Sequence, residues 1–464
     1  MAQPSAREAA ERRGIFDHSR PLWQVMGIFL VPLILGNILQ SASGTISSVF
    51  VGRLLGVNAL AAISAFFPVL FLLVSFLIGV SSGSTVLIGQ AYGARDEHTL
   101  KRIVGTSITF TFILGCLAAL AGLLFTRETL VLLGTPANIM NDSVAYARII
   151  YLMLPVIFVF FTYIAFMRGT GDSTTPFIFL LVGALFGSAI TPALILGWFG
   201  LPRLGLVSAA VSALSANTLT FIIMMIYLRV IKHPLALDEE TVHDLKIDWP
   251  ILRQMVRIGI PTGVQLILVS LSELAVISFV NRFGSHATAA YGAVNQIASY
   301  VQFPAVSIGI AASIFGAQAI GANREDILRN VVKSAVWLNY GIGGVLIALA
   351  YVFKRDIAGW FLTDPGTLDI ATSLLSITLW SYLLFGNSAV LSGIMRASGA
   401  VIWPTTIGVF SIWGVEVPTA YILSHRIGLT GIWIGYPAAF VTGLILQSVY
   451  YTFVWKRQRH QRLV

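Results

Sequence analysis

Charged residues are scarce in this chain. Asp, Glu, Lys and Arg make up 11% of its 464 residues, whereas an ordinary soluble domain carries about 25%. Hydrophobic residues account for 56%, and apolar runs of more than about 20 residues recur along the whole length. These runs exclude a large soluble helical protein and indicate helices that cross a membrane.

Other absences narrow the class further. Cys116 is the only cysteine, so an internal disulfide is excluded, and we expect Cys116 to pack as a small apolar side chain. No Gly-rich loop is followed by Lys and then Ser or Thr, which disfavours an ATP-driven pump. The seven His residues show no metal-ligand spacing. We therefore expect no metal site, no cofactor and no enzymatic activity.

The apolar runs predict an all-α polytopic membrane protein. They are too long, and alternate too little, to be the strands of a membrane barrel. We predict twelve transmembrane helices, at residues 22–50, 57–84, 99–125, 143–167, 176–200, 205–230, 251–280, 286–316, 330–353, 368–395, 402–424 and 430–455.

The chain also contains an internal duplication. Gln-Ala-Tyr-Gly-Ala at 90–94 recurs as Gln-Ala-Ile-Gly-Ala at 318–322. Six spans in each copy keep both copies the same way up in the membrane. The repeat therefore predicts two six-helix lobes related by a pseudo-twofold axis along the membrane normal, with a site between them. Further pairs keep this spacing to within one residue: Pro32 with Pro261, Arg53 with Arg282, and Arg168 with Arg396.

The placement of the basic residues predicts the topology. Most of the 29 Lys and Arg residues fall in the two tails or in loops on the same side as the tails, so both termini are expected in the cytoplasm. The net charge is +9, but the basic residues are spread over loops and do not cluster on one soluble face. We therefore expect no nucleic-acid partner. The predicted parts are a cytoplasmic N-tail at 1–20, an N-lobe at 21–231 with spans 1–6, a cytoplasmic linker at 232–250, a C-lobe at 251–455 with spans 7–12, and a basic C-tail at 456–464.

Several motifs resemble those of the multidrug and toxic compound extrusion (MATE) transporters, and their order on twelve spans extends the resemblance over about residues 20–455. The motifs are Val-Gly-Arg-Leu at 51–54 with Ala-Leu-Ala-Ala at 59–62, Gly-Gln-Ala-Tyr-Gly-Ala at 89–94, Arg-Gly-Thr-Gly-Asp-Ser-Thr-Thr-Pro at 168–176, Gly-Ile-Pro at 259–261 and Gly-Leu-Thr-Gly-Ile-Trp at 428–433.

The resemblance implies a secondary antiporter. Such proteins export organic cations, drugs or metabolites in exchange for protons or sodium ions. For this chain we expect alternating access, a small-molecule substrate that is an organic cation or an amphipath, and a monomer in the lipid bilayer of a bacterial inner (plasma) membrane.

The N-terminal half departs from the family pattern. Members commonly carry an acid in span 1 and an Asp before Pro in span 5. Here Ser47 and Ser48 stand in the first stretch, and Thr191 precedes Pro192 in the second. An N-lobe proton mechanism therefore does not transfer directly to this chain.

The second half carries acids instead. Glu273 in span 7 and Glu416 in span 11 are the only acids well inside apolar runs. A charge at the centre of a membrane helix costs about 2.5–3.5 kcal/mol on insertion scales, so such residues usually face the bundle interior or a watery cavity. We interpret both as residues that couple transport to a proton or another cation. For Glu416, an ion pair with Arg148 or Arg426 is the alternative.

Polar and aromatic residues at helical spacing are candidates for the cavity lining. The aromatic rings could stack on a planar or cationic ligand, whereas hydrogen bonds between helices and core packing are the competing roles. The predicted lining residues are Asn37, Gln40, Ser47, Phe158, Phe161, Thr191, Gln265, Asn295, Gln296, Tyr300, Tyr382 and Asn387.

Two other classes compete with the antiporter. A flippase for a lipid-linked or amphipathic substrate would favour a cationic cavity, and the spans hold no cluster of Lys or Arg. A membrane receptor or membrane enzyme is disfavoured by the duplication of six spans.

Overall fold

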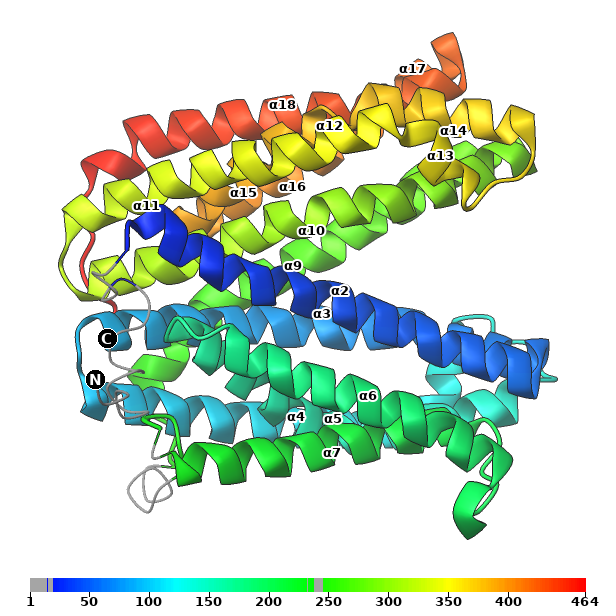
Figure 1. The fold of residues 1–464 in the computed structure, drawn as a ribbon, viewed down its shortest axis with the longest axis horizontal. Coiled ribbons are helices and arrows are strands. Elements are labelled where there is room, and N and C mark those ends of the chain that lie inside the picture. Colours follow the sequence, from blue (N-terminus) through cyan, green and yellow to red (C-terminus); the bar gives the residue numbers. More distant parts are fainter. Residues whose placement is uncertain (1–14, 16–19, 232, 238–244) are drawn as a thin grey trace.

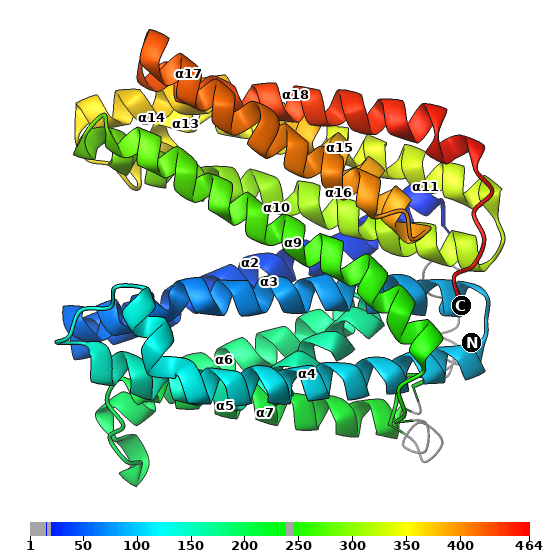
Figure 2. The same ribbon diagram turned by 180° about the vertical axis from the view of Figure 1, so that it is seen from behind.

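We describe the protein from a computed structural model, which covers residue 15 and residues 20–231, 233–237 and 245–464. Every regular element in these ranges is a helix, and the helices form two bundles that lie one above the other in Figures 1 and 2. The predicted all-α fold is confirmed. The predicted N-tail and linker lie partly outside the described residues, at 1–14, 16–19, 232 and 238–244.

The N-lobe is built from long, nearly continuous helices. Pro residues lie inside several of them, and α4 is kinked at Phe125, where φ is −112°. The helices are α2 (Leu22–Leu55), α3 (Val57–Gly93), α4 (Glu97–Leu132), α5 (Met140–Gly169), α6 (Thr174–Leu196) and α7 (Val207–Val230), with a short 3₁₀ turn η2 (Trp198–Gly200) between the last two.

The C-lobe divides its spans into more pieces. Two of its helices are interrupted by π-helical segments, η3 (Asn339–Gly343) and η4 (Phe410–Glu416), and α14 and α15 meet at a bend of 45°. The other elements are α9 (Trp249–Asn281), α10 (Ser285–Gly321), α11 (Glu325–Leu338), α12 (Gly344–Val352), α13 (Lys354–Gly359), α14 (Pro365–Thr378), α15 (Ser381–Ala397), α16 (Ile402–Val409), α17 (Val417–Ile427), α18 (Leu429–Phe453) and η5 (Trp455–Arg457).

The number of spans agrees with the sequence. Among the described residues, 11 helices are long and apolar enough to cross a membrane, and the count reaches 12 when the bent pair α14 and α15 is taken as one span. The turns repeat as well, since φ is 88° at Gly56 and 92° at its counterpart Gly284, and 54° at both Arg95 and Asn323. The duplication therefore extends to the backbone.

The two lobes meet at one end only. They converge at the end where both termini lie and diverge toward the other (Figures 1 and 2). Within the described ranges, the hydrogen bonds between the lobes all lie in the half of the molecule next to the termini. Along α2, the bond farthest from the termini is the one that Asn37 donates to the Ser307 hydroxyl at 3.1 Å. We call this half the closed end and the opposite half the open end.

Glycines allow the lobes to touch at the closed end. A Cβ atom added to Gly79 would lie 2.6 Å from the Gly259 carbonyl oxygen, and one added to Gly83 would lie 2.3 Å from that of Met255. Small residues one helical turn apart let membrane helices pack backbone against backbone. This spacing therefore sets the crossing of α3 and α9.

Cys116 corrects one expectation. It lies on α4 and is exposed rather than packed among other helices. The prediction of a buried role was wrong because an apolar run alone does not show which face of a membrane helix is turned toward lipid.

Candidate functional site

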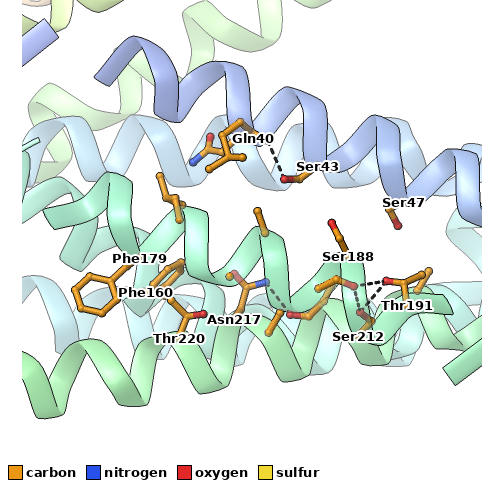
Figure 3. Close-up of a pocket in the computed structure, with 18 of the residues that line it drawn as sticks. Gln40, Ser43, Ser47, Phe160, Phe179, Ser188, Thr191, Ser212, Asn217 and Thr220 are labelled. Carbon is orange, nitrogen blue, oxygen red and sulfur yellow. Dashed lines mark hydrogen bonds between the residues drawn. The ribbon is translucent and has the colours of Figure 1, made fainter. Parts of the chain in front are cut away.

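The N-lobe encloses a pocket of about 320 Å³ between α2, α5, α6 and α7. Figure 3 shows Gln40, Ser43 and Ser47 on one side, facing Ser188 and Asn217 across the pocket. Ser and Thr hydroxyls, two amides and four phenyl rings line it together with aliphatic side chains, and none of the lining side chains is charged. A volume of this size suits a small ligand or one part of a larger ligand.

Thr191 and Ser212 fix the polar wall of this pocket. Both hydroxyls lie within hydrogen-bond distance of the Gly187 carbonyl oxygen, at 2.8 and 3.0 Å, and they lie 2.8 Å from each other. Thr191 thus bonds the carbonyl four residues earlier in its own helix, and Ser212 ties α7 to the same carbonyl. The position before Pro192 thus holds a satisfied neutral group.

The C-lobe contains a different arrangement, which we call the acidic cluster: Glu273, Glu416, Tyr291, Tyr382 and Tyr436. Glu416 is 4% exposed, whereas the Glu273 side chain is accessible. The two carboxylates interact electrostatically with each other and with Tyr291 and Tyr382. Two like charges in a site of low dielectric constant repel, so a bound proton or cation between them is favoured.

The tyrosines of the acidic cluster come from three helices. The hydroxyls of Tyr291 on α10 and Tyr436 on α18 lie 3.2 Å apart. Trp433 stacks on the Tyr291 ring, with centroids 5.2 Å apart and an angle of 29° between the planes. Tyr382 on α15 packs against Phe440 on α18. The carboxylates therefore lie near rings whose faces attract cations and whose hydroxyls can donate or accept.

A π-helical segment positions Glu416. It is the last residue of η4, and the Trp413 indole N–H in the same segment donates to the Leu268 carbonyl on α9 at 3.0 Å. On the other side, Gly435 of α18 packs so closely that an added Cβ would lie 2.9 Å from the Glu416 carbonyl oxygen. The π-helical turn widens the helix where Glu416 enters the bundle, and such segments are frequent at functional sites.

Glu416 has no basic partner among the described residues. The alternative of an ion pair with Arg148 or Arg426 is therefore wrong for this structure.

Comparison with known proteins identifies the family. The MatE family model matches the chain twice, over residues 32–193 and 261–422. The matched segments begin at Pro32 and Pro261, which the duplication already pairs. This chain belongs to the MATE family.

Individual relatives agree with this assignment. The chain is 54% identical to the "Probable multidrug resistance protein YoeA" of Bacillus subtilis, over 96% of this chain and 97% of the relative. It is 26% identical to the "Multidrug export protein MepA" of a Staphylococcus aureus strain, over 89% of each chain. A solved structure of a mutant MATE transporter VcmN from Vibrio cholerae matches with a TM-score of 0.86 at 19% identity, covering 98% of this chain and 99% of that chain. The solved structure supports the fold alone.

The predicted cavity residues of this MATE protein fall into two groups around these sites. Gln40, Ser47, Phe161 and Thr191 line the N-lobe pocket. Asn295 contacts Tyr291 of the acidic cluster, to which Tyr382 also belongs. Other predicted lining residues lie elsewhere: Gln296 and Tyr300 are exposed on α10, and Gln265 is half-buried where α9 packs against Gly408.

Three predicted lining residues have packing or hydrogen-bonding roles in the structure. Phe158 is 2% exposed and packs in the apolar core of the N-lobe. Asn37 bridges the lobes at the closed end. Asn387 is buried and fully engaged, since it accepts from Asn339 and donates to Tyr340. Helical spacing could not show these partners because they lie on other helices.

Several residues of both sites were missed by sequence reasoning. Span 5 was assigned to the cavity through Thr191 alone, and spans 6 and 12 were not assigned to it. These spans nevertheless supply Ser188, Ser212 and Asn217 to the pocket and Tyr436 to the acidic cluster. A signal exists in span 6, where Ser208, Ser212 and Thr220 recur at helical spacing on one side.

Proposed function

We propose that this MATE transporter is a secondary antiporter that exports organic cations or amphipathic drugs and metabolites in exchange for protons or sodium ions. The observation that carries the proposal is the acidic cluster, where Glu273 and Glu416 interact with each other near aromatic rings and have no basic partner among the described residues. A membrane interior retains such charges at a cost of several kcal/mol, which selects for a function.

The cluster suits exchange because proton and cation compete for the same carboxylates. When a proton is bound, the repulsion between Glu273 and Glu416 is relieved and affinity for a cationic substrate falls. When a substrate or sodium cation is bound, the ionised form is favoured and the proton is released. Each occupant therefore displaces the other, which couples their movements.

The N-lobe pocket complements this chemistry. It has no charge with which to bind a cation, but Phe160, Phe161 and Phe179 offer ring faces, and Gln40 and Asn217 offer hydrogen bonds. We infer that it binds the neutral, partly aromatic portion of a substrate. The names of the Bacillus subtilis and Staphylococcus aureus relatives support drugs as the substrate class.

We further propose a monomer in the inner (plasma) membrane, with the closed end and both termini in the cytoplasm, and with no cofactor beyond the coupling ion. The described conformation is then open to the outside. Alternating access requires a second conformation in which the closed end opens.

Proteoliposomes with a fluorescent planar cation such as ethidium test the proposal. Addition of ethidium should release protons or sodium ions from wild type, and Glu273→Gln should abolish this release. Unchanged release and transport in the variant would remove Glu273 from the mechanism. Transport that needs sodium and ignores a pH gradient would exclude protons, and movement of a labelled lipid without any ion exchange would favour the flippase.

A further inference from the structure

The glutamines of the repeated motif bond reciprocally across the closed end. Gln90 on α3 donates to the Ala397 carbonyl of the C-lobe at 2.8 Å, and Gln318 on α10 donates to the Gly169 carbonyl of the N-lobe at 2.9 Å. Both glutamines are completely buried. Each lobe thus donates a hydrogen bond to the last carbonyl group of a helix in the other lobe. The two bonds are equivalent under the duplication.

Two backbone N–H groups near the termini complete this pair. The Gln90 side-chain oxygen accepts from the Leu463 backbone N–H at 2.8 Å, and that of Gln318 accepts from the Ile15 backbone N–H at 3.2 Å. Figure 2 shows the segment after α18 descending past the ends of the C-lobe helices toward α3. Each glutamine that joins the lobes therefore also accepts a hydrogen bond from a residue that belongs to no span.

The segment at 455–463 is attached to both lobes. Trp455 is 2% exposed, and its indole N–H donates to the Ser398 hydroxyl of the C-lobe at 2.8 Å. His460 stacks on the Trp455 ring at 3.9 Å. Farther along, Arg462 pairs with Asp96 of the N-lobe at 2.8 Å. The segment therefore spans the joint between the lobes.

We propose that residues 455–463 form a latch that holds the closed end together and must leave Asp96 and Gln90 before that end can open. The latch begins at Trp455 on the C-lobe and ends on Asp96 and Gln90 of the N-lobe, so the lobes cannot separate at this end while the contacts of Arg462 and Leu463 remain. This proposal depends on the alternating access of the proposed function, and it adds a gate to that mechanism.

A single cysteine can report on opening. Ser84 is completely buried at the closed end, and its hydroxyl lies 2.9 Å from the Met255 sulfur across the lobe interface. In a Cys116→Ser background, Ser84→Cys should react with a small, membrane-impermeant methanethiosulfonate applied from the side of the closed end only when the lobes separate there.

Arg462→Ala should raise the labelling rate of Ser84→Cys about two- to fivefold, the range expected for loss of a partly exposed ion pair. Arg459→Ala is the matched control, because it removes the same charge from an exposed position in the same segment. Asp96→Asn should act like Arg462→Ala, since Asn still caps α4, and the double variant should add nothing to either single change. Unchanged melting temperatures show that the variants remain folded.

Equal labelling in the Arg462→Ala and Arg459→Ala proteins, with faster labelling in Gln90→Ala, would overturn the latch and leave the glutamine contacts alone as the gate. If Ser84→Cys stays unreactive from that side in every variant, the closed end does not open. Both the latch and the alternating access of the proposed function would then be wrong.

Discussion

In the N-lobe, hydroxyls, amides and phenyl rings line a pocket without a single charged side chain, whereas the C-lobe holds Glu273 and Glu416 among three tyrosines. The counterpart of Glu273 in the first copy is Gly44, and Glu416 falls near Thr191 and Pro192. The helices and turns of the two lobes repeat, but their buried charge does not. The two copies therefore share their backbone fold but differ in the residues that can bind an ion.

Backbone regularity differs in the same direction. The helices α5 and α6 of the N-lobe run without interruption, while the corresponding region of the C-lobe contains the bend between α14 and α15 and the π-helical segment η4 that ends at Glu416. Irregular backbone at membrane depth is tolerated where protein surrounds it. The lobe with the carboxylates is thus the lobe whose helices are adapted to position them.

The largest expected effect comes from placing an acidic residue in the N-lobe pocket, which has no charged side chain. Thr191→Asp should destabilise the protein by about 2.5–3.5 kcal/mol, because it places a carboxylate at a buried position without a basic partner. Thr191→Asn is the control of similar size without the charge. Thermal unfolding in detergent measures the difference, and an Asp variant as stable as the Asn variant would show that the N-lobe pocket can hold a charge after all.

Neutralising the other lobe should affect transport rather than stability. Glu416→Gln should weaken the coupling between substrate and ion about 5- to 150-fold, the usual range for linked sites. In the N-lobe, Ser47→Ala should leave the coupling unchanged. Substrate-driven ion release from proteoliposomes provides the measurement, and equal losses in the two variants would contradict the division of roles.

At the closed end, equivalent substitutions in the two lobes should have equal effects on stability. Gln90→Ala and Gln318→Ala each remove the hydrogen bond donated to the other lobe and the one accepted from a backbone N–H near a terminus. Each change leaves buried partners unpaired, so each should cost about 1–3 kcal/mol of stability. Equilibrium unfolding of the two variants should give similar values. A large difference would mean that the scaffold, and not only its charge, has diverged between the lobes.

The smallest expected effect concerns pH: the contribution of the ion pair between Arg462 and Asp96 to the closed end should not change near neutral pH. The pKa of Asp96 is lowered to about 2, first by the hydrogen bond from the Thr99 backbone N–H and also by Arg462. A lowered carboxyl pKa means that the interaction is fully present above the ordinary pKa and is lost only as the pH falls toward the lowered one. The ratio of Ser84→Cys labelling rates with and without Arg462→Ala should therefore be equal at about pH 5.5 and about pH 8. A ratio that changes in this window would assign a pH response to the closed end.

Much of this architecture was predictable because bilayer thickness and duplication leave little freedom. Helix number, the two lobes and the isolation of Glu273 and Glu416 follow from apolar runs and repeated motifs. The partners of those acids were less accessible, since Tyr436 lies on α18, a span with no acid to draw attention to it. Asn387 shows the opposite error, because a polar residue in a span was read as cavity lining when Asn339 already satisfied it. Which polar group finds a partner is decided by packing between helices, and one sequence does not contain that information.

The crossing of α3 and α9 has a mechanical consequence. At Gly79, Gly83 and Gly259 the two helices meet through backbone atoms, with no side chain between them that would have to change its rotamer. A contact of this kind can rotate like a fulcrum with little repacking, whereas interdigitated side chains would resist. The glycines lie where the lobes begin to diverge, so a small rotation about them is amplified along the length of α3 and α9 into a large displacement at either end.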